Sequence, residues 1–430
     1  MSFGEKTFTL LTLVIACAVT SAAHAEPPAC SPLQRNLAVR NVMEDLYLWS
    51  SRVSAPNPAA FQTPEAYLDA YRYRPLDQTF SYITSRAAND ALYQDSSYIG
   101  LGFSSVWRGA RLVLSEVFPS SPASDAGLSR GDEIVAIGGR SVVDLQNNNE
   151  LLVAFGRNEN GAVTDVEFAR GGQRFSRQLA KRPIVIPTVS GMRTFDVDGV
   201  RVGYLVSRNF VEPTSNALDA TFAELRRQRV AELILDLRYN GGGLVTAAQH
   251  LGGLVGGTLT NGQVFVSFEH NDRNHYQDKS LRFRATDRSL TLRRLVVITS
   301  RATASAAELV VNALQPFMPV VVIGDRTYGK PVGQYPITFC DKVLAPVSFS
   351  SVNANGAGSY FAGLPATCSA EDDTDHSLGD PAESSLKEAL WFISHGRCSV
   401  AARGGSAAQR TQEIWRRTAG GGWAELLGAN

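Results

Sequence analysis

Residues 301–334 read RATASAAELVVNALQPFMPVVVIGDRTYGKPVGQ, and this stretch decides the fold of the larger part of the chain. It follows an apolar run, Leu295–Ile298, and it contains a second one, Val320–Ile323. Between them, apolar residues recur at steps of three and four from Leu309 to Leu314, which predicts a helix between two buried strands. Strand–helix–strand units of this kind build α/β sheets.

Ser305 stands where this helix begins. Ser305 and Glu308 have the spacing of a capping box, in which the serine only caps the helix. A helix N-terminus also offers free N–H groups and a dipole that favour negative charge, which suits a nucleophile. Lys330, taken alone, is interpreted as a solvated lysine in a turn. Neither residue identifies a function without the other.

A nucleotide site is the first alternative. Gly324–Lys330 has the G-x-x-x-x-G-K spacing of a phosphate-binding loop after an apolar run. Pro331, however, occupies the place of the Ser or Thr that binds magnesium, and Val332–Ile337 looks extended instead of helical. We therefore expect neither nucleotide binding nor any other cofactor.

Residues 1–25 have the pattern of a secretory signal peptide. Lys6 precedes an apolar segment, Phe8–Val19, which is too short for a membrane span. Ala23–Ala25 is a small-x-small cleavage site, and no other stretch is expected to cross a bilayer. We expect an exported chain, most simply in a bacterial periplasm. The alternatives are secretion and a lipoprotein anchored at Cys17, which follows the lipobox-like V-I-A.

Composition narrows the class of protein. The 430 residues suit two or three domains, and 44% of them are hydrophobic. The 41 basic and 41 acidic side chains cancel, so no basic surplus points to nucleic acid.

The cysteines left after cleavage are even in number, which in an exported protein predicts disulfides. They are Cys30, Cys340, Cys368 and Cys398. Three pairings are open, and we expect Cys340–Cys368 and Cys30–Cys398. No metal is expected, because no C-x-x-C occurs and the spacing of His270 and His275 suits no common helical site.

The chain divides into five segments. After the leader, residues 26–95 are expected to form a helical domain, residues 96–185 a β-rich domain and residues 186–400 an α/β core. Residues 401–430, rich in Gly, Ala and Arg, are expected to form a flexible tail.

The β-rich segment resembles a PDZ domain. Its G-L-G-F at 100–103 is followed in order by S-P-A-x-x-A-G-L at 121–128 and G-D-E-I at 131–134. The resemblance implies that backbone N–H groups of Leu101, Gly102 and Phe103 hold the C-terminal carboxylate of a peptide, which adds to an open strand edge. The partners would be protein or peptide substrates with a free C-terminus.

Three further motifs resemble those of the carboxyl-terminal processing proteases, the S41 serine peptidases. They are D-L-R-Y-N-G-G-G at 236–243, T-A-S-A-A-E at 303–308 and T-Y-G-K-P-V-G-Q at 327–334. The resemblance implies a multidomain α/β and α+β protein with a ClpP/crotonase-like protease core. Thr303, Ala307 and Pro331 depart from the pattern of many relatives, but the central serine is kept.

The same resemblance assigns roles to residues. Ser305 would be the nucleophile, Lys330 its general base and Gln334 the residue that orients Lys330. Backbone N–H groups of Ala306 and of Gly243, or of Gly242, would bind the oxyanion. Two other functions stay open: a catalytically inactive PDZ-bearing scaffold and a different exported serine hydrolase.

A Ser305–Lys330 dyad requires a lowered pKa at Lys330. Its amine must be neutral to accept a proton, so its pKa has to fall from about 10.4 to roughly 7–8. Burial against apolar walls can cause such a shift. Gln334 can accept a hydrogen bond from the amine without adding the negative charge that would raise this pKa.

Overall fold

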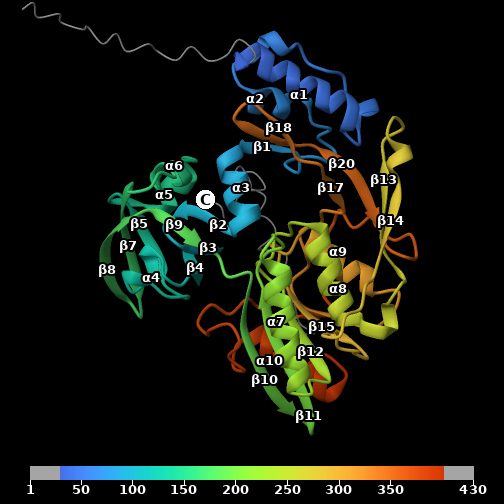
Figure 1. Cartoon of the computed structure of the whole chain (residues 1–430). Helices are drawn as coiled ribbons and strands as arrows, with labels where there is room; N and C mark the ends of the chain where they lie inside the picture. The colour runs from blue at the N-terminus through green and yellow to red at the C-terminus, as the bar shows by residue number, and fades with distance from the viewer. Residues whose placement is uncertain (1–29, 401–430) are drawn as a thin grey trace, which may run out of the picture.

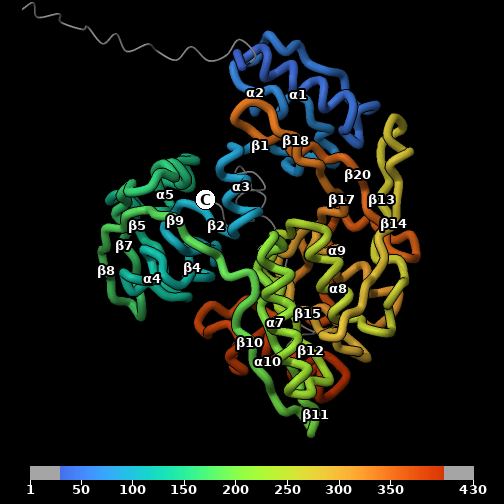
Figure 2. The backbone as a smooth tube through the Cα atoms, viewed as in Figure 1, coloured from blue at the N-terminus to red at the C-terminus, as the bar shows by residue number. Residues whose placement is uncertain are grey.

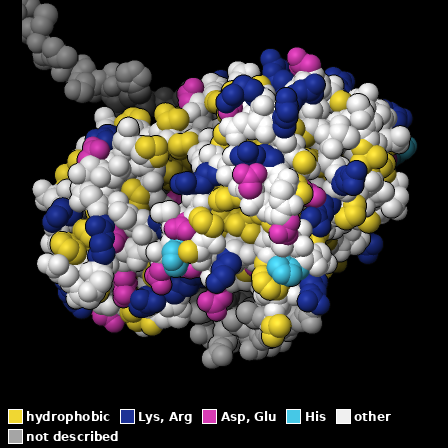
Figure 3. Space-filling model, turned by 90° about the horizontal axis from the view of Figure 1, so that it is seen from below, with side chains coloured by type: hydrophobic (Ala, Val, Ile, Leu, Met, Phe, Trp, Pro, Cys, Tyr) yellow, Lys and Arg dark blue, Asp and Glu magenta, His cyan; other side chains and the backbone are white. Residues whose placement is uncertain are grey.

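The computed structural model describes residues 30–400. The expected leader, the alternative lipidation site Cys17 and the expected tail 401–430 lie outside these residues. Within 30–400, none of the helices is long and apolar enough to cross a membrane. On the face seen in Figure 3, basic and acidic side chains are interspersed, in keeping with the balanced composition.

Residues 30–95 form a helical cap with one strand (Figure 1). Its elements are α1 (Pro32–Leu46), α2 (Pro64–Tyr71), β1 (Tyr82–Ser85) and α3 (Arg86–Asp95). Proline stands at the start of α1 and α2, where its missing N–H costs nothing, and Ser31 and Thr63 cap them. β1 pairs with β19 of the core, so the cap is joined to the core through a sheet.

The second unit is a small sheet with short helices. It consists of β3 (Phe103–Arg108), β4 (Arg111–Val117), α4 (Pro122–Asp125), β5 (Glu133–Ile137), β6 (Arg140–Ser141), α5 (Val142–Asn147), α6 (Leu151–Ala154), β7 (Val163–Arg170) and β8 (Gln173–Ala180). The strand order is β3-β4-β5-β7-β8, which leaves β3 at an edge. This unit is connected to the rest of the chain by a two-stranded stalk (Figure 2). The stalk consists of β2 (Ser97–Gly100) and β9 (Arg182–Val185), which pair with each other.

The core is a three-layer α/β unit. Its sheet has the order β10-β11-β12-β15-β16-β21, and all neighbours after β10 and β11 are parallel. The strands are β10 (Val189–Val197), β11 (Val200–Ser207), β12 (Glu232–Asp236), β15 (Leu295–Thr299), β16 (Val320–Gly324) and β21 (Cys368–Ser369). Side chains alternate between two cores, because successive strand residues face opposite sides. The helices that cover these faces are α7 (Thr214–Arg227), α8 (Val245–Thr260) and α9 (Ala306–Leu314) on one side and α10 (Ser384–His395) on the other.

Two antiparallel sheets complete the core. One has the order β14-β13-β20-β17 and the other β1-β19-β18. Their core strands are β13 (Val264–His270), β14 (Lys279–Arg282), β17 (Val332–Gln334), β18 (Ile337–Phe339), β19 (Lys342–Ala345) and β20 (Val347–Val352). Strands β19 and β20 belong to different sheets although only Pro346 separates them in the chain. After Lys330 the chain continues as strand β17, which agrees with the argument against a phosphate-binding loop.

The expected disulfide pairing is wrong. The structure joins Cys30 to Cys340 and Cys368 to Cys398, not Cys340 to Cys368 and Cys30 to Cys398. Helix α1 packs beside β18 near its turn, which brings Cys30 to Cys340. β21 lies at the sheet edge against the end of α10, which brings Cys368 to Cys398. Tertiary packing, not separation in sequence, sets both pairs.

Candidate active site

Ser305 sits at a strained point of the backbone. It is the N-cap of α9, with φ 53° and ψ −120°, a conformation that costs a residue with a side chain on the order of 1–3 kcal/mol. Such strain persists only where the surroundings impose it, and it is concentrated at functional sites. The helix start predicted from sequence is therefore also a constrained position.

Lys330 is buried, with 1% of its surface exposed. Its Nζ donates a hydrogen bond to Gln334 Oε1 at 2.9 Å and lies 5.9 Å from the centre of the Phe80 ring. Gln334 Nε2 in turn donates to the Phe80 carbonyl at 2.7 Å, which fixes the orientation of the amide. Burial lowers the pKa of Lys330 well below its ordinary value, although the carboxylates of Asp77 and Glu308 act in the opposite direction.

Glu308 connects Ser305 to Lys330. One of its oxygens, Oε2, accepts the backbone N–H of Ser305 at 2.9 Å and that of Lys330 at 2.8 Å. The other, Oε1, accepts from the Gly329 N–H at 2.7 Å and the Thr327 hydroxyl at 2.5 Å. Burial raises the pKa of this fully buried carboxyl, and the four donors oppose that rise. The capping-box spacing predicted Glu308 near Ser305 but not its contact with the Lys330 turn.

The glycine loop after β12 lies against Ser305. A Cβ atom added to Gly242 would stand 2.8 Å from that of Ser305, and one on Gly243 would stand 2.0 Å from the Phe210 carbonyl oxygen. The Gly242 N–H donates to Asn240 Oδ1 at 2.8 Å and is therefore occupied. Among residues 30–400, no acceptor is found for the N–H of Gly243 or of Ala306. Of the two glycines considered from sequence, this favours Gly243 as an oxyanion donor.

The helical cap contributes to the site, which the sequence did not indicate. Phe80 supplies both the carbonyl that holds Gln334 and a ring beside the Lys330 amine. Asp77 is fully buried and accepts hydrogen bonds from Tyr47 Oη at 2.9 Å and Ser81 Oγ at 2.6 Å. No motif surrounds these residues, so only the tertiary structure could identify them.

The loop of Leu101, Gly102 and Phe103 opens edge strand β3. Gly102 has φ +91°, and a Cβ there would stand 2.0 Å from that of Ser121, so only glycine fits. The Leu101 side chain is buried in the domain core, which leaves only its backbone to meet a peptide. The half-buried Phe103 ring packs against the Phe155 ring, with 5.9 Å between the two ring centres.

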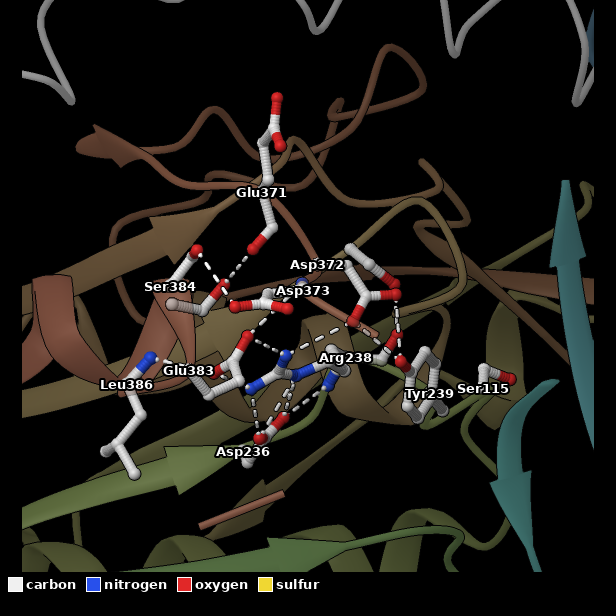
Figure 4. A network of polar contacts seen from close by, with 12 residues as sticks. Ser115, Asp236, Arg238, Tyr239, Glu371, Asp372, Asp373, Glu383, Ser384 and Leu386 are labelled. Atoms are coloured by element: carbon white, nitrogen blue, oxygen red, sulfur yellow. Dashed lines mark hydrogen bonds and ion pairs between the residues drawn. The ribbon is translucent and has the colours of Figure 1, made fainter. Parts of the chain in front are cut away.

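Arg238, close before the glycine loop, is buried among three carboxylates (Figure 4). It pairs with Asp236 at 2.8 Å, Glu383 at 2.7 Å and Asp372 at 3.2 Å. Asp372 also accepts the Tyr239 hydroxyl at 2.7 Å. This network fixes the segment Asp236–Tyr239, which leads into the glycine loop.

Among residues 30–400, Cys368, Glu388 and Cys398 are the one group of at least three potential metal ligands that lies close together, and its two sulfur atoms form a disulfide. His270 contacts Asp278 and Tyr335 through its two ring nitrogens, and His275 contacts the Asp272 carbonyl. These contacts give both histidines structural roles.

Three family models match the chain in order. Residues 34–82 match the peptidase S41 N-terminal domain, residues 92–164 match the PDZ domain and residues 201–360 match peptidase family S41. The matches fall on the helical cap, the small sheet and the core. The fold expected from sequence, a helical segment, a PDZ domain and an S41 core, is confirmed.

Curated relatives and a solved structure agree with these matches. The chain is 27% identical to the carboxy-terminal processing protease CtpB of Bacillus subtilis, over 60% of this chain and 52% of that protein. It is 28% identical to the chloroplastic C-terminal processing peptidase of Tetradesmus obliquus, over 62% and 59%. A Bacteroides fragilis crystal structure assigned to the S41 proteases has a TM-score of 0.67 at 25% identity, covering 83% of this chain and 97% of that one. The chain spans about half the length of the curated relatives it matches. By its domains and its relatives, this chain belongs to peptidase family S41.

Proposed function

We propose that this chain is an exported serine endopeptidase that cleaves protein tails with a Ser305–Lys330 dyad. The observation that carries the proposal is the buried Lys330 amine, whose pKa is lowered by burial and whose backbone shares one Glu308 oxygen with the backbone of Ser305. A buried lysine with a lowered pKa, linked through Glu308 to a serine on a strained helix start, is suited to act as the base of that serine once it is neutral.

The first half-reaction forms an acyl-enzyme. Ser305 Oγ attacks the scissile carbonyl carbon while its proton passes to Lys330 Nζ. The oxyanion of the tetrahedral intermediate is stabilised by the N–H groups of Gly243 and Ala306. When the intermediate collapses, the C–N bond breaks and Lys330 returns the proton to the leaving amine.

The second half-reaction consumes one water. Lys330, neutral again, accepts a proton from water as the water oxygen attacks the acyl carbon. The ester bond to Ser305 Oγ then breaks, Ser305 regains its proton from Lys330 and the product leaves as a carboxylic acid. Gln334 keeps the amine oriented throughout without adding a negative charge.

Edge strand β3 and the loop before it support recognition of a peptide end. A peptide can add to the open edge of β3, and the loop N–H groups at its start can bind a terminal carboxylate. Substrates with a free, apolar C-terminus are therefore proposed. Amidation of that terminus should raise KM, whereas equal cleavage of acid and amide would exclude this mode of recognition.

The proposed compartment is oxidising. Two disulfides within residues 30–400 suit an exported protein, and the leader pattern at residues 1–25 agrees with the bacterial periplasm. A protein lipidated at Cys17 or released from the cell would satisfy the same observations; cell fractionation and mass spectrometry of the mature N-terminus separate the three cases.

The test is cleavage of an unfolded protein substrate by wild type, Ser305→Ala and Lys330→Ala between pH 6 and 10. We expect wild type to cleave, with a rate that rises through an ionisation well below that of free lysine, and both variants to lose activity. Activity retained in Lys330→Ala would mean that another group is the base. A wild type without activity, with and without a peptide for the PDZ domain, would favour the scaffold alternative.

A further inference from the structure

Tyr239 lies between the PDZ domain and the glycine loop. Its hydroxyl donates to Asp372 at 2.7 Å and accepts from Arg130 Nη1 of the PDZ domain at 2.6 Å. Its backbone carbonyl accepts a hydrogen bond from Arg208, whose Nε donates to Glu116 of the PDZ domain at 2.7 Å. The hydroxyl and the backbone carbonyl of Tyr239 therefore both take part in hydrogen-bond networks that include PDZ residues.

Asp372 is contacted by hydrogen-bond donors from both the core and the PDZ domain. From the core it accepts Tyr239 and Arg238, and from the PDZ domain it accepts Arg130 Nη2 at 2.9 Å and Arg108 Nη2 at 2.8 Å. These cations lower the pKa of Asp372 below its ordinary value despite its burial. Its side chain is only 13% exposed, so loss of either arginine would leave a largely buried charge less compensated.

The contact between the two domains is tight. Arg130 also donates to the carbonyls of Asp373 and His376, both at 2.9 Å. A Cβ atom on the neighbouring Gly131 would stand 2.7 Å from the Thr374 carbonyl oxygen. The PDZ domain therefore rests directly on the segment that carries Asp372.

The glycine loop follows Tyr239 without an intervening element. Asn240 donates to the Ser207 carbonyl at 3.0 Å and orients the Gly242 N–H, and Gly242 lies against Ser305. Only Asn240, Gly241 and Gly242 separate Tyr239 from Gly243, so little chain is available to absorb a displacement of Tyr239. A 1 Å misplacement around a reacting centre can cost about 10²-fold in rate.

We infer that Tyr239 and Asp372 are positioning residues for the oxyanion loop, and that Arg108 and Arg130 make the shape of this loop depend on the docked PDZ domain. The inference rests on the proposed function of the loop. The PDZ domain in the arrangement seen here thus favours catalysis, through side chains to which the sequence motifs assigned no role.

The kinetic test compares Tyr239→Phe, Arg130→Gln and their double variant with wild type. Tyr239→Phe keeps the ring and removes only the bridging hydroxyl. We expect each single variant to lower kcat by about 10- to 100-fold with KM for a short substrate changed less than about twofold. The double variant should lose less than the product of the single losses, because both changes break one chain of contacts. The pH dependence should keep its wild-type midpoint, since Lys330 is not touched.

Arg170→Gln is the matched control. It removes another arginine of the PDZ domain, which pairs with Asp132 at 2.6 Å inside that domain. We expect wild-type kcat from this variant. A loss as large as that of Arg130→Gln would mean that any damage to the PDZ domain lowers activity, and it would overturn the inference.

A second readout does not depend on turnover. In a Ser305→Ala background, amide hydrogen exchange of residues 240–244 should speed up with Arg130→Gln and not with Arg170→Gln. If wild type cleaves in a Ser305-dependent way but Tyr239→Phe and Arg130→Gln keep their kcat and exchange rates, the inference fails and the proposed function stands. If wild type does not cleave, the proposed function fails, and the exchange rates alone decide whether the PDZ domain orders the loop.

Discussion

Lys330 carries an amine that is protonated in water, yet its side chain is buried in the protein. Its hydrogen bond to Gln334 gives the amine a partner that carries no charge. Asp77 and Glu308 are close enough to favour the protonated form, yet burial dominates and lowers the pKa. At the scale of single residues, the site depends on keeping further negative charge away from this amine.

Gln334→Glu tests that balance. A carboxylate beside the amine should raise the pKa of Lys330, so the neutral fraction at pH 7 falls and the pH–rate profile moves to higher pH. We expect about a tenfold or larger loss of kcat/KM at pH 7, with partial recovery near pH 10. The exposed Gln173→Glu, which adds the same charge to the PDZ domain, should leave the profile unchanged. An unshifted profile in Gln334→Glu would remove Gln334 from the dyad.

Lys330→Met tests the cost of burying the amine. Because the folded-state pKa is lowered, the unfolded chain binds a proton that the folded chain releases, so wild-type stability rises with pH up to about 10.4. The variant lacks this penalty. Lys330→Met should therefore be inactive but more stable than wild type at pH 7, and the difference should shrink towards pH 10. Urea unfolding across this range measures it, with the exposed Lys387→Met as control; a destabilised Lys330→Met would contradict the expected burial cost.

The elements that the sequence predicted best are those whose signal is local. Buried parallel strands have continuous apolar runs, and β15 and β16 each lie on the run expected for them. Ser305, Lys330 and Gln334 stood in motifs. In the structure Lys330 contacts Gln334, and the backbones of Ser305 and Lys330 share one Glu308 oxygen. Strand β17 lies in a stretch that looked extended, but its pairing with β20 could not be predicted from the sequence. The Gln334–Phe80 contact joins residues 254 positions apart, and no local pattern encodes such a contact.

The loop between β12 and α8 is the element most sensitive to a single methyl group. Gly243 has φ +130° and no room for a Cβ beside the Phe210 carbonyl. Gly243→Ala should displace the proposed oxyanion donor and lower kcat by about 10²-fold or more. Gly199→Ala is the control, because Gly199 also has a positive φ, at +78°, but no atom within 4 Å of an added Cβ. It should lower stability by about 1 kcal/mol and leave kcat unchanged; similar kcat values for both variants would exclude Gly243 as a donor.

At the scale of the whole molecule, two disulfides close loops of very different length. Cys30–Cys340 spans 310 residues and Cys368–Cys398 spans 30. If chain entropy dominates, the longer loop stabilises more, so Cys30→Ser/Cys340→Ser should cost about 5–6 kcal/mol and Cys368→Ser/Cys398→Ser about 3–4 kcal/mol. Urea unfolding of both double variants measures the order, and a larger cost for the short loop would show that native packing, not loop length, decides.

The contribution of Phe80 has a consequence for the timing of activity. The Phe80 ring lies beside the Lys330 amine and helps to exclude water from it. Phe80 precedes Lys330 by 250 positions, and the PDZ domain lies between them in the sequence. Until the cap and core have closed on each other, we expect Lys330 to be hydrated and protonated, and Ser305 to lack a base. A newly made or partly unfolded chain would then be unable to cleave itself or its neighbours, because the catalytic base forms only with the long-range contacts between cap and core.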